Sequence, residues 1–189
     1  IELTSDNHLL LTGVVNYVNG DYDAYISKIN LDGEVIWSKN YGGSHRQRAL
    51  QGKKAVDGDF IFAGWNEING NAGSISFFLF KTDMNGDTLW TKTYPNNGMR
   101  QTGYAVVQNI DQGYLIAGSI QQPLQEGPDI FLMKTDDTGD IIWTKIIDNP
   151  GSNEAREIVI GNSGNIIISG WSAASGCAHP ILAEINQDG

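Results

Sequence analysis

Repetition of one sequence pattern constrains the fold of this chain more than any other feature. The copies occupy 24–40, 77–93 and 130–146. Each copy consists of an apolar stretch, a turn of Asn or Asp with Gly, and a second stretch with Trp four residues after the Gly. The tryptophans are 53 residues apart (90 − 37 and 143 − 90), namely Trp37, Trp90 and Trp143. A fixed period in this range is typical of repeats that each form one four-stranded blade.

Each period contains four stretches with the composition of β-strands. In the third repeat these stretches are 104–108, 113–119, 129–135 and 141–147. The second and third stretches are apolar on both faces, so both faces need to be covered. Blades that pack face to face provide this cover without helices. We therefore predict an all-β fold, a β-propeller of four-stranded antiparallel blades with about four repeats of roughly 53 residues.

The repeats divide the chain into four predicted blades within a single propeller region. Their ranges are 1–43, 44–97, 98–150 and 151–189. The pattern predicts that the first blade lacks its first strand and the fourth its last, so both blades are incomplete. Open sheet edges are templates for pairing. We therefore expect the chain to be part of a larger ring, or to associate with a protein partner or a second copy through these edges.

The repeated turn and the repeated tryptophan each have a structural interpretation. Gly33, Gly86 and Gly139 occupy the place in a tight hairpin that needs a positive φ. Tryptophans that recur at one strand position favour packing between blades. The turn 136–140 also resembles half of a calcium loop, but it lacks the distal bidentate Glu and has the length of a hairpin. The sequence therefore favours turn chemistry over a metal site.

Composition excludes several classes of function. The 12 Lys and Arg against 22 Asp and Glu give a net charge of −10, which opposes binding to nucleic acid. No apolar run has the length of a membrane-spanning helix, so we expect no membrane insertion. Cys177 is the single cysteine, and His8, His45 and His179 occupy different repeat positions. We therefore predict no disulfide, no metal, no cofactor and no catalytic residue.

The block K-T-D-x-x-G-D-x-x-W-T-K, with G-Y-L-I-A-G upstream, resembles the repeats of secreted β-propeller proteins of Bacteroidota-type bacteria. It is similar, more loosely, to the tryptophan-docking repeats of PQQ-like quinoprotein propellers. The residues that carry this likeness are Asp136, Thr138, Gly139 and Trp143, with Asp83, Gly86 and Trp90 in the preceding copy. The resemblance implies a propeller at the cell surface or outside the cell. Lys28, Lys81 and Lys134 replace the small residue of the docking pattern, and no quinone ligand set accompanies it.

Three functions fit these observations. We predict a non-enzymatic extracellular scaffold or protein-interaction module, because no polar cluster confined to one repeat is apparent. The first alternative is a carbohydrate-binding propeller, with a glycan stacked on Trp65 or Trp171, which each follow a Gly at a strand end. The second alternative is a fragment of a quinoprotein-like or hydrolytic enzyme. Function depends on sites and not on the fold, so these alternatives stay open at this point.

Overall fold

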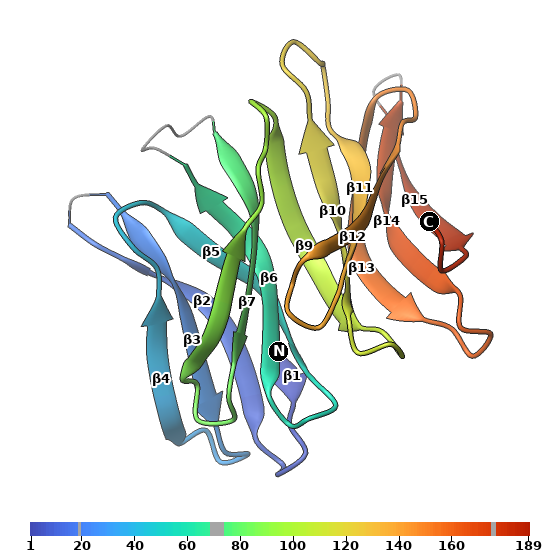
Figure 1. Cartoon of the computed structure of the whole chain (residues 1–189). Coiled ribbons are helices and arrows are strands. Elements are labelled where there is room, and N and C mark those ends of the chain that lie inside the picture. Colours follow the sequence, from blue (N-terminus) through green and yellow to red (C-terminus); the bar gives the residue numbers. More distant parts are fainter. Residues whose placement is uncertain (19, 69–73, 175–176) are drawn as a thin grey trace. The chain divides into compact units, whose positions relative to one another are not determined.

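The computed structural model describes residues 1–18, 20–68, 74–174 and 177–189. These residues form fifteen strands joined by turns and loops, in three four-stranded sheets and one three-stranded sheet (Figure 1). All strand pairs are antiparallel. The predicted all-β architecture of repeated antiparallel sheets is therefore confirmed. The chain divides into two compact units, 1–95 and 96–189, and each contains two sheets.

Unit 1 contains the two sheets with strand orders β1-β2-β3-β4 and β5-β6-β7-β8. The strands of the first sheet are β1 (Glu2–Leu3), β2 (Leu9–Asn16), β3 (Tyr22–Ile29) and β4 (Val35–Tyr41). The strands of the second are β5 (Gln47–Lys54), β6 (Phe60–Glu67), β7 (Ile75–Thr82) and β8 (Thr88–Thr93). The sequence predicted no first strand in the first repeat. This was wrong, because Glu2 and Leu3 pair with Leu10 and Leu9 as a short first strand.

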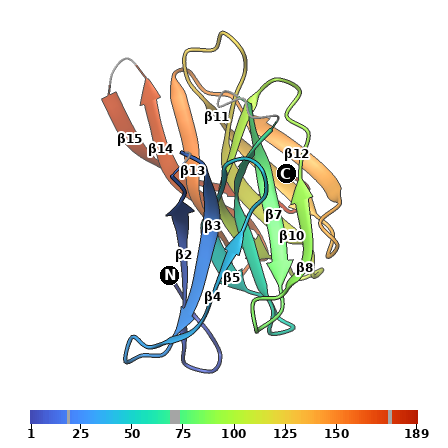
Figure 2. The same ribbon diagram turned by 90° about the vertical axis from the view of Figure 1, so that its left-hand side faces the viewer.

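Unit 2 contains the remaining seven strands, in the orders β12-β11-β10-β9 and β13-β14-β15. The first sheet is made of β9 (Arg100–Gln108), β10 (Tyr114–Gln121), β11 (Asp129–Thr135) and β12 (Ile141–Ile147). The second is made of β13 (Ser152–Ile160), β14 (Ile166–Ala174) and β15 (Cys177–Ile185). Figures 1 and 2 both show β13, β14 and β15 side by side. The first strands of the two sheets, β9 and β13, pack against each other.

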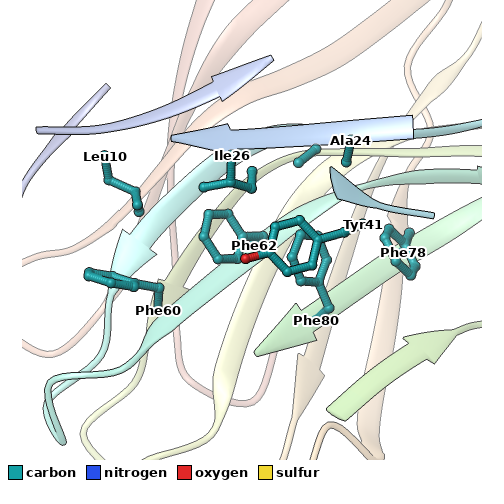
Figure 3. Packing of buried hydrophobic residues seen from close by; sticks show 9 residues of the cluster. Leu10, Ala24, Ile26, Tyr41, Phe60, Phe62, Phe78 and Phe80 are labelled. Atoms are coloured by element: carbon teal, nitrogen blue, oxygen red, sulfur yellow. The ribbon is translucent and has the colours of Figure 1, made fainter. Parts of the chain in front are cut away.

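A cluster of aromatic rings fills the space between the two sheets of unit 1. Phe62 stacks on Phe80 with ring centroids 4.7 Å apart, and Tyr41 lies 4.9 Å from Phe80. Figure 3 shows these three rings grouped together, with Phe60 to one side and Phe78 to the other. The corresponding core of unit 2 is aliphatic, and its buried members include Leu115, Ile130, Leu132, Ile158 and Ile168. Burial of these side chains explains why the middle strands carry apolar residues on both faces of the sheet.

A β-bulge in the first strand of a sheet explains why one glycine recurs in the second strand. The register shifts between Ala49 and Gln51 in β5, and the same irregularity occurs in β9 and in β13. The glycine opposite the bulge is Gly64, Gly118 or Gly170. A Cβ there would lie only 1.7–1.9 Å from the carbonyl oxygen of residue 48, 102 or 154. Since real Cβ atoms do not approach a backbone oxygen so closely, these positions need glycine.

The repeated turn has the backbone conformation that its glycine requires. The φ angles of Gly33, Gly86 and Gly139 are 87°, 78° and 84°, a region that side chains other than glycine rarely adopt. In the third copy, Asp136 Oδ1 accepts hydrogen bonds from the backbone N–H groups of Thr138 at 3.0 Å and Asp140 at 2.8 Å. The acidic residue therefore stabilises the turn through its own backbone.

The repeated tryptophan of one sheet binds the repeated turn of the next sheet in the same unit. In unit 1, the indole N–H of Trp37 donates to the carbonyl of Met84 at 3.2 Å, and Lys39 pairs with Asp87 at 2.6 Å. In unit 2, Trp143 donates in the same way to the carbonyl of Gln187 at 3.2 Å. The side chains of Trp37, Trp90 and Trp143 lie half-buried on β4, β8 and β12.

The lysine that pairs with each tryptophan across the strands has a partner of its own. Lys28, Lys81 and Lys134 stand opposite Trp37, Trp90 and Trp143. Each forms an ion pair with an aspartate of the turn between the first two strands of its sheet, namely Asp6, Asp57 and Asp111. The lysine therefore ties this turn to the sheet.

Candidate functional site

The predicted ligand-binding residue Trp171 lies next to a buried carboxylate. Trp171 is half-buried on β14, where it pairs across the sheet with Glu154 of β13. Its indole N–H donates to Glu154 Oε2 at 3.2 Å. Glu154 itself is 9% exposed, which is unusual for a glutamate and requires hydrogen-bonding partners.

Two further side chains complete the surroundings of Glu154. The Tyr104 hydroxyl of β9 donates to Glu154 Oε1 at 3.2 Å, and the Arg156 guanidinium forms an ion pair with Glu154 Oε2. The guanidinium carbon of Arg156 also lies 3.9 Å from the centroid of the Tyr104 ring, within the range of a cation–π interaction. We call Tyr104, Glu154, Arg156 and Trp171 the Glu154 cluster.

The β-bulges of unit 2 bring the members of this cluster together. The extra residue is Tyr104 in β9 and Arg156 in β13, because the register passes directly from Ala105 to Gly103 and from Ala155 to Glu157. A bulge redirects the side chain of its extra residue. Since β9 and β13 pack against each other, the two redirected side chains stack; Tyr104 approaches Glu154 from the neighbouring sheet and Arg156 from the same strand.

The electrostatics of the cluster fix Tyr104 as a hydrogen-bond donor. Burial, together with the negative charge of Glu154, raises the pKa of Tyr104 above that of an exposed tyrosine. The phenol therefore keeps its proton at neutral pH. The Glu154 carboxylate has about four acceptor sites in total, and three donors approach it, two of them at Oε2. Oε1 thus retains capacity for a ligand hydroxyl, and Arg156, whose side chain is 50% exposed, retains N–H donors.

Glu154, Arg156 and Tyr104 were not predicted as site residues from the sequence. Aligned on the glycine opposite the bulge, the position of Glu154 holds Thr102 in the third repeat and Arg48 in the second. The bulge position holds Arg156 in the fourth repeat, Tyr104 in the third and Leu50 in the second. The signal that could have found them is therefore a place where the repeats differ in charge while the glycine opposite stays constant.

Trp65 occupies the position of Trp171 in the second repeat but has different neighbours. Its partner across the strands is Arg48 rather than a glutamate. The ring lies edge-on to Tyr22, with centroids 5.8 Å apart. The guanidinium carbon of Arg46 lies over the Tyr22 ring, 5.7 Å from its centroid. Trp65 and Trp171 are therefore half-buried residues in two chemically distinct surroundings.

The groups that the sequence offered for metal or thiol chemistry make none of the contacts of the Glu154 cluster described above. Within the described ranges there is no group of three or more His, Cys, Asp or Glu side chains placed to hold a metal ion. The carboxylate of Asp136 binds the backbone of its own turn, as described above. His8 lies 3.1 Å from Asp6, and Cys177 is an exposed thiol at the start of β15. The part of the chain that the structure describes also contains no helix with the length and apolarity to cross a bilayer.

Comparison with known proteins detects similarity at the level of the fold. No protein-family model and no curated protein matches the chain. A mannose phosphorylase from Leishmania mexicana, solved in complex with a phosphate ion, is similar with a TM-score of 0.58 and 12% identity over 98% of this chain. A thermostable family-43 glycoside hydrolase is similar with a TM-score of 0.59 and 9% identity over 96%. A hypothetical protein from Leishmania major gives a TM-score of 0.56 and 12% identity over 98%.

These comparisons correct the function predicted from the sequence. The chain spans 66%, 65% and 69% of the lengths of the three solved chains. Two of them are carbohydrate-processing enzymes by name, which overturns the prediction of a non-enzymatic scaffold or interaction module and leaves the prediction "not an enzyme" without support. The physical premise was also wrong, because the Glu154 cluster is a polar constellation confined to one part of the repeat array.

Proposed function

We propose that this chain is part of a carbohydrate-processing β-propeller and that the Glu154 cluster binds a sugar unit of its substrate. The single observation that carries the proposal is the buried Glu154 carboxylate, held by Trp171, Tyr104 and Arg156 where two sheets meet. The resemblance of the fold to two carbohydrate-processing enzymes supports it. In the proposed ring, the sheets are the blades and the bulged first strands line the axis.

The chemistry of the cluster matches that of a sugar. A pyranose presents hydroxyl groups that both donate and accept, together with an apolar face of C–H groups. Glu154 Oε1 is positioned to accept from a hydroxyl, and the outward N–H groups of Arg156 to donate to one. The half-buried rings of Trp171 and Tyr104 provide amphipathic surfaces beside these polar groups. Binding sites combine apolar surface with a few placed polar groups in this way.

The proposed role of the cluster is to bind and orient, not to break the glycosidic bond alone. Glycoside hydrolysis uses two carboxyl groups placed on either side of the scissile bond. The Glu154 cluster contains one carboxylate, and its three donors hold it in a fixed orientation. Cleavage by the whole protein would therefore use a second acidic group outside this cluster.

The proposal can be tested by glycan binding with two variants and a matched control. A glycan array on the purified chain identifies a ligand, and calorimetry then measures its affinity. Glu154→Gln removes the charge of the acceptor, so we expect affinity to fall by at least about tenfold, as for loss of a charged hydrogen bond. Trp171→Ala should weaken binding similarly, whereas Trp65→Ala, at the same repeat position, should not.

Two outcomes would contradict the proposal. One is unchanged affinity in Glu154→Gln when circular dichroism shows a native fold. The other is equal loss of affinity in Trp65→Ala and Trp171→Ala, which would indicate a general effect of removing an indole. Release of sugar from aryl glycosides, or from oligosaccharides supplied with inorganic phosphate, would then test whether the whole protein cleaves what it binds.

A further inference from the structure

We infer that a cleft between the two sheets of unit 1 is a second binding site, specific for an uncharged sugar unit. The cleft has a volume of about 320 Å³, within the range of small-molecule sites. Its walls come from β4, β5, β6, β7 and β8, and its central residues are Tyr41, Gln47, Asn66, Phe78, Thr91 and Thr93. It shares no residue with the Glu154 cluster and does not depend on the function proposed for that cluster.

The lining of this cleft is neutral although the chain is acidic. Its side chains are amides, hydroxyls and two aromatic rings, without Asp, Glu, Lys, Arg or His. The Asp23 carboxylate lies against Gly42 of the lining, where it accepts a hydrogen bond from the Tyr17 hydroxyl at 2.8 Å, and it is not itself part of the lining. Neutral hydrogen-bonding groups suit an uncharged ligand, because a charged one would have to leave water without a counter-charge.

A chain of hydrogen bonds orients the polar groups of the cleft. The backbone N–H of Gly43 donates to Gln47 Oε1 at 3.0 Å, and Gln47 Nε2 donates to Asn66 Oδ1 at 2.9 Å. Asn66 Nδ2 donates in turn to Thr93 Oγ1 at 2.9 Å. All three bonds run in one direction, so they polarise one another. The chain ends at the exposed Thr93 hydroxyl, which accepts from Asn66 and keeps its own proton free to donate to a ligand in the cleft.

The apolar part of the cleft is equally fixed. Phe78 and Tyr41 are 6% and 7% exposed, so they belong to the core, and both also line the cleft. The Tyr41 hydroxyl donates to the carbonyl of Gly86 at 2.7 Å, which prevents the ring from turning away. A rigid apolar floor beneath directed hydroxyl and amide groups matches a sugar, which has a C–H face and a hydroxyl rim.

Two of the positions that line the cleft differ in chemistry between the two units. The positions of Asn40 and Tyr41 in the first repeat hold Ile146 and Ile147 in the third. The amide and the phenol of unit 1 are therefore replaced by aliphatic side chains in unit 2. Gln47 and Asn66 correspond to Asn153 and Ser172, so the difference between the units lies at Asn40 and Tyr41.

The test uses the whole chain, a blocking variant and a matched control. Thr91 is exposed in the cleft, so Thr91→Lys fills it without disturbing the core, and Thr144→Lys makes the same change at the same repeat position in unit 2. Thr93→Val removes the terminal donor and keeps the shape. The probes are methyl α-mannoside and methyl β-xyloside as uncharged sugars, with glucuronate as the anionic comparison, titrated by NMR on labelled protein.

We expect the uncharged glycosides to shift the amide signals of Asn66 and Thr93. Thr91→Lys should lower the affinity by at least about tenfold, and Thr93→Val by about threefold to tenfold, as for one neutral hydrogen bond. Thr144→Lys and Glu154→Gln should leave this binding unchanged. Shifts confined to the Glu154 cluster, no shift with either glycoside, or stronger binding of glucuronate would overturn the inference. The first of these would leave the function proposed for the Glu154 cluster intact.

Discussion

Substituting alanine for the recurring glycine of the second strand should have opposite effects in the first two repeats, because only the second repeat has a β-bulge facing it. Gly64 faces the bulge of β5, and a Cβ there would lie 1.7 Å from the carbonyl oxygen of Arg48. Gly13 occupies the same repeat position, but β1 is too short to extend opposite it, and its nearest neighbour would be 3.8 Å from a Cβ. The first substitution forces two backbones apart, whereas the second meets only ordinary contact.

The magnitudes follow from this geometry. Moving a backbone oxygen out to a normal contact distance requires a shift of more than an ångström in a hydrogen-bonded pair of strands. We expect Gly64→Ala to cost about 3 kcal/mol, the upper end of the range for overpacking. Gly13→Ala should be neutral or stabilise by about 0.5–1 kcal/mol, because alanine loses less backbone entropy in a strand than glycine does.

Urea denaturation with hydrogen exchange measures both effects. A loss of about 3 kcal/mol lowers the midpoint by about 1–3 M for urea m-values of about 1–3 kcal/mol per M. For Gly64→Ala, hydrogen exchange should show the loss of stability in unit 1. Gly118→Ala, whose Cβ would lie 1.9 Å from the backbone carbonyl oxygen of Thr102, should produce the loss in unit 2. Equal stability of the Gly13→Ala and Gly64→Ala proteins would refute the role assigned to the bulge.

Three further predictions concern single contacts. Trp143→Phe removes the hydrogen bond to the carbonyl of Gln187, so unit 2 should lose about 1 kcal/mol in urea denaturation, and no loss would exclude a stabilising role for that bond. The hydrogen bond from Lys28 holds the pKa of Asp6 well below its usual value. The stability that ionised Asp6 contributes through this hydrogen bond is complete above about pH 4 and is lost as the pH falls below that value. Asp6→Asn should therefore flatten the acid limb of a plot of unfolding free energy against pH. Because burial beside a carboxylate raises its pKa, Tyr104 should ionise later than exposed tyrosines in a spectrophotometric titration, and Tyr104→Phe should remove that late step.

The repeat pattern predicts the parts of the fold that obey the same local physics in every copy. The hairpin glycine needs a positive φ wherever the turn occurs, so Gly33 and Gly86 stand out in the sequence as they do in the structure. The recurrence of Trp37 at one strand position predicts packing against a neighbouring repeat, and in the structure its indole N–H binds the carbonyl of Met84. Two-residue strands have no such signature, and β1 could not be predicted because a stretch of that length has no measurable period.

The Glu154 cluster was harder to predict for a different reason. Alternation along a strand assigns each residue to one face, and a β-bulge breaks this alternation at a single residue. From the sequence, Glu154 and Arg156 therefore look like solvated charges near the end of a strand. Trp171 could be singled out because an aromatic residue at a strand end is conspicuous by itself, but its carboxylate partner is placed by a shift in register that hydrophobicity does not encode.

The bulge gives this fold a way to separate stability from recognition. The glycine opposite it is constrained by a backbone contact in all three sheets that have the bulge. At Gly170, for example, a Cβ would lie 1.9 Å from the backbone carbonyl oxygen of Glu154. The extra residue carries no such constraint, because it lacks a partner in the register, and it is Leu50, Tyr104 or Arg156. Side chains can therefore change at this position without disturbing the strand pairing that holds the sheets together. A cluster built from two such residues on adjacent first strands is where a repeat protein with nearly uniform sheets can acquire a site found in one place only.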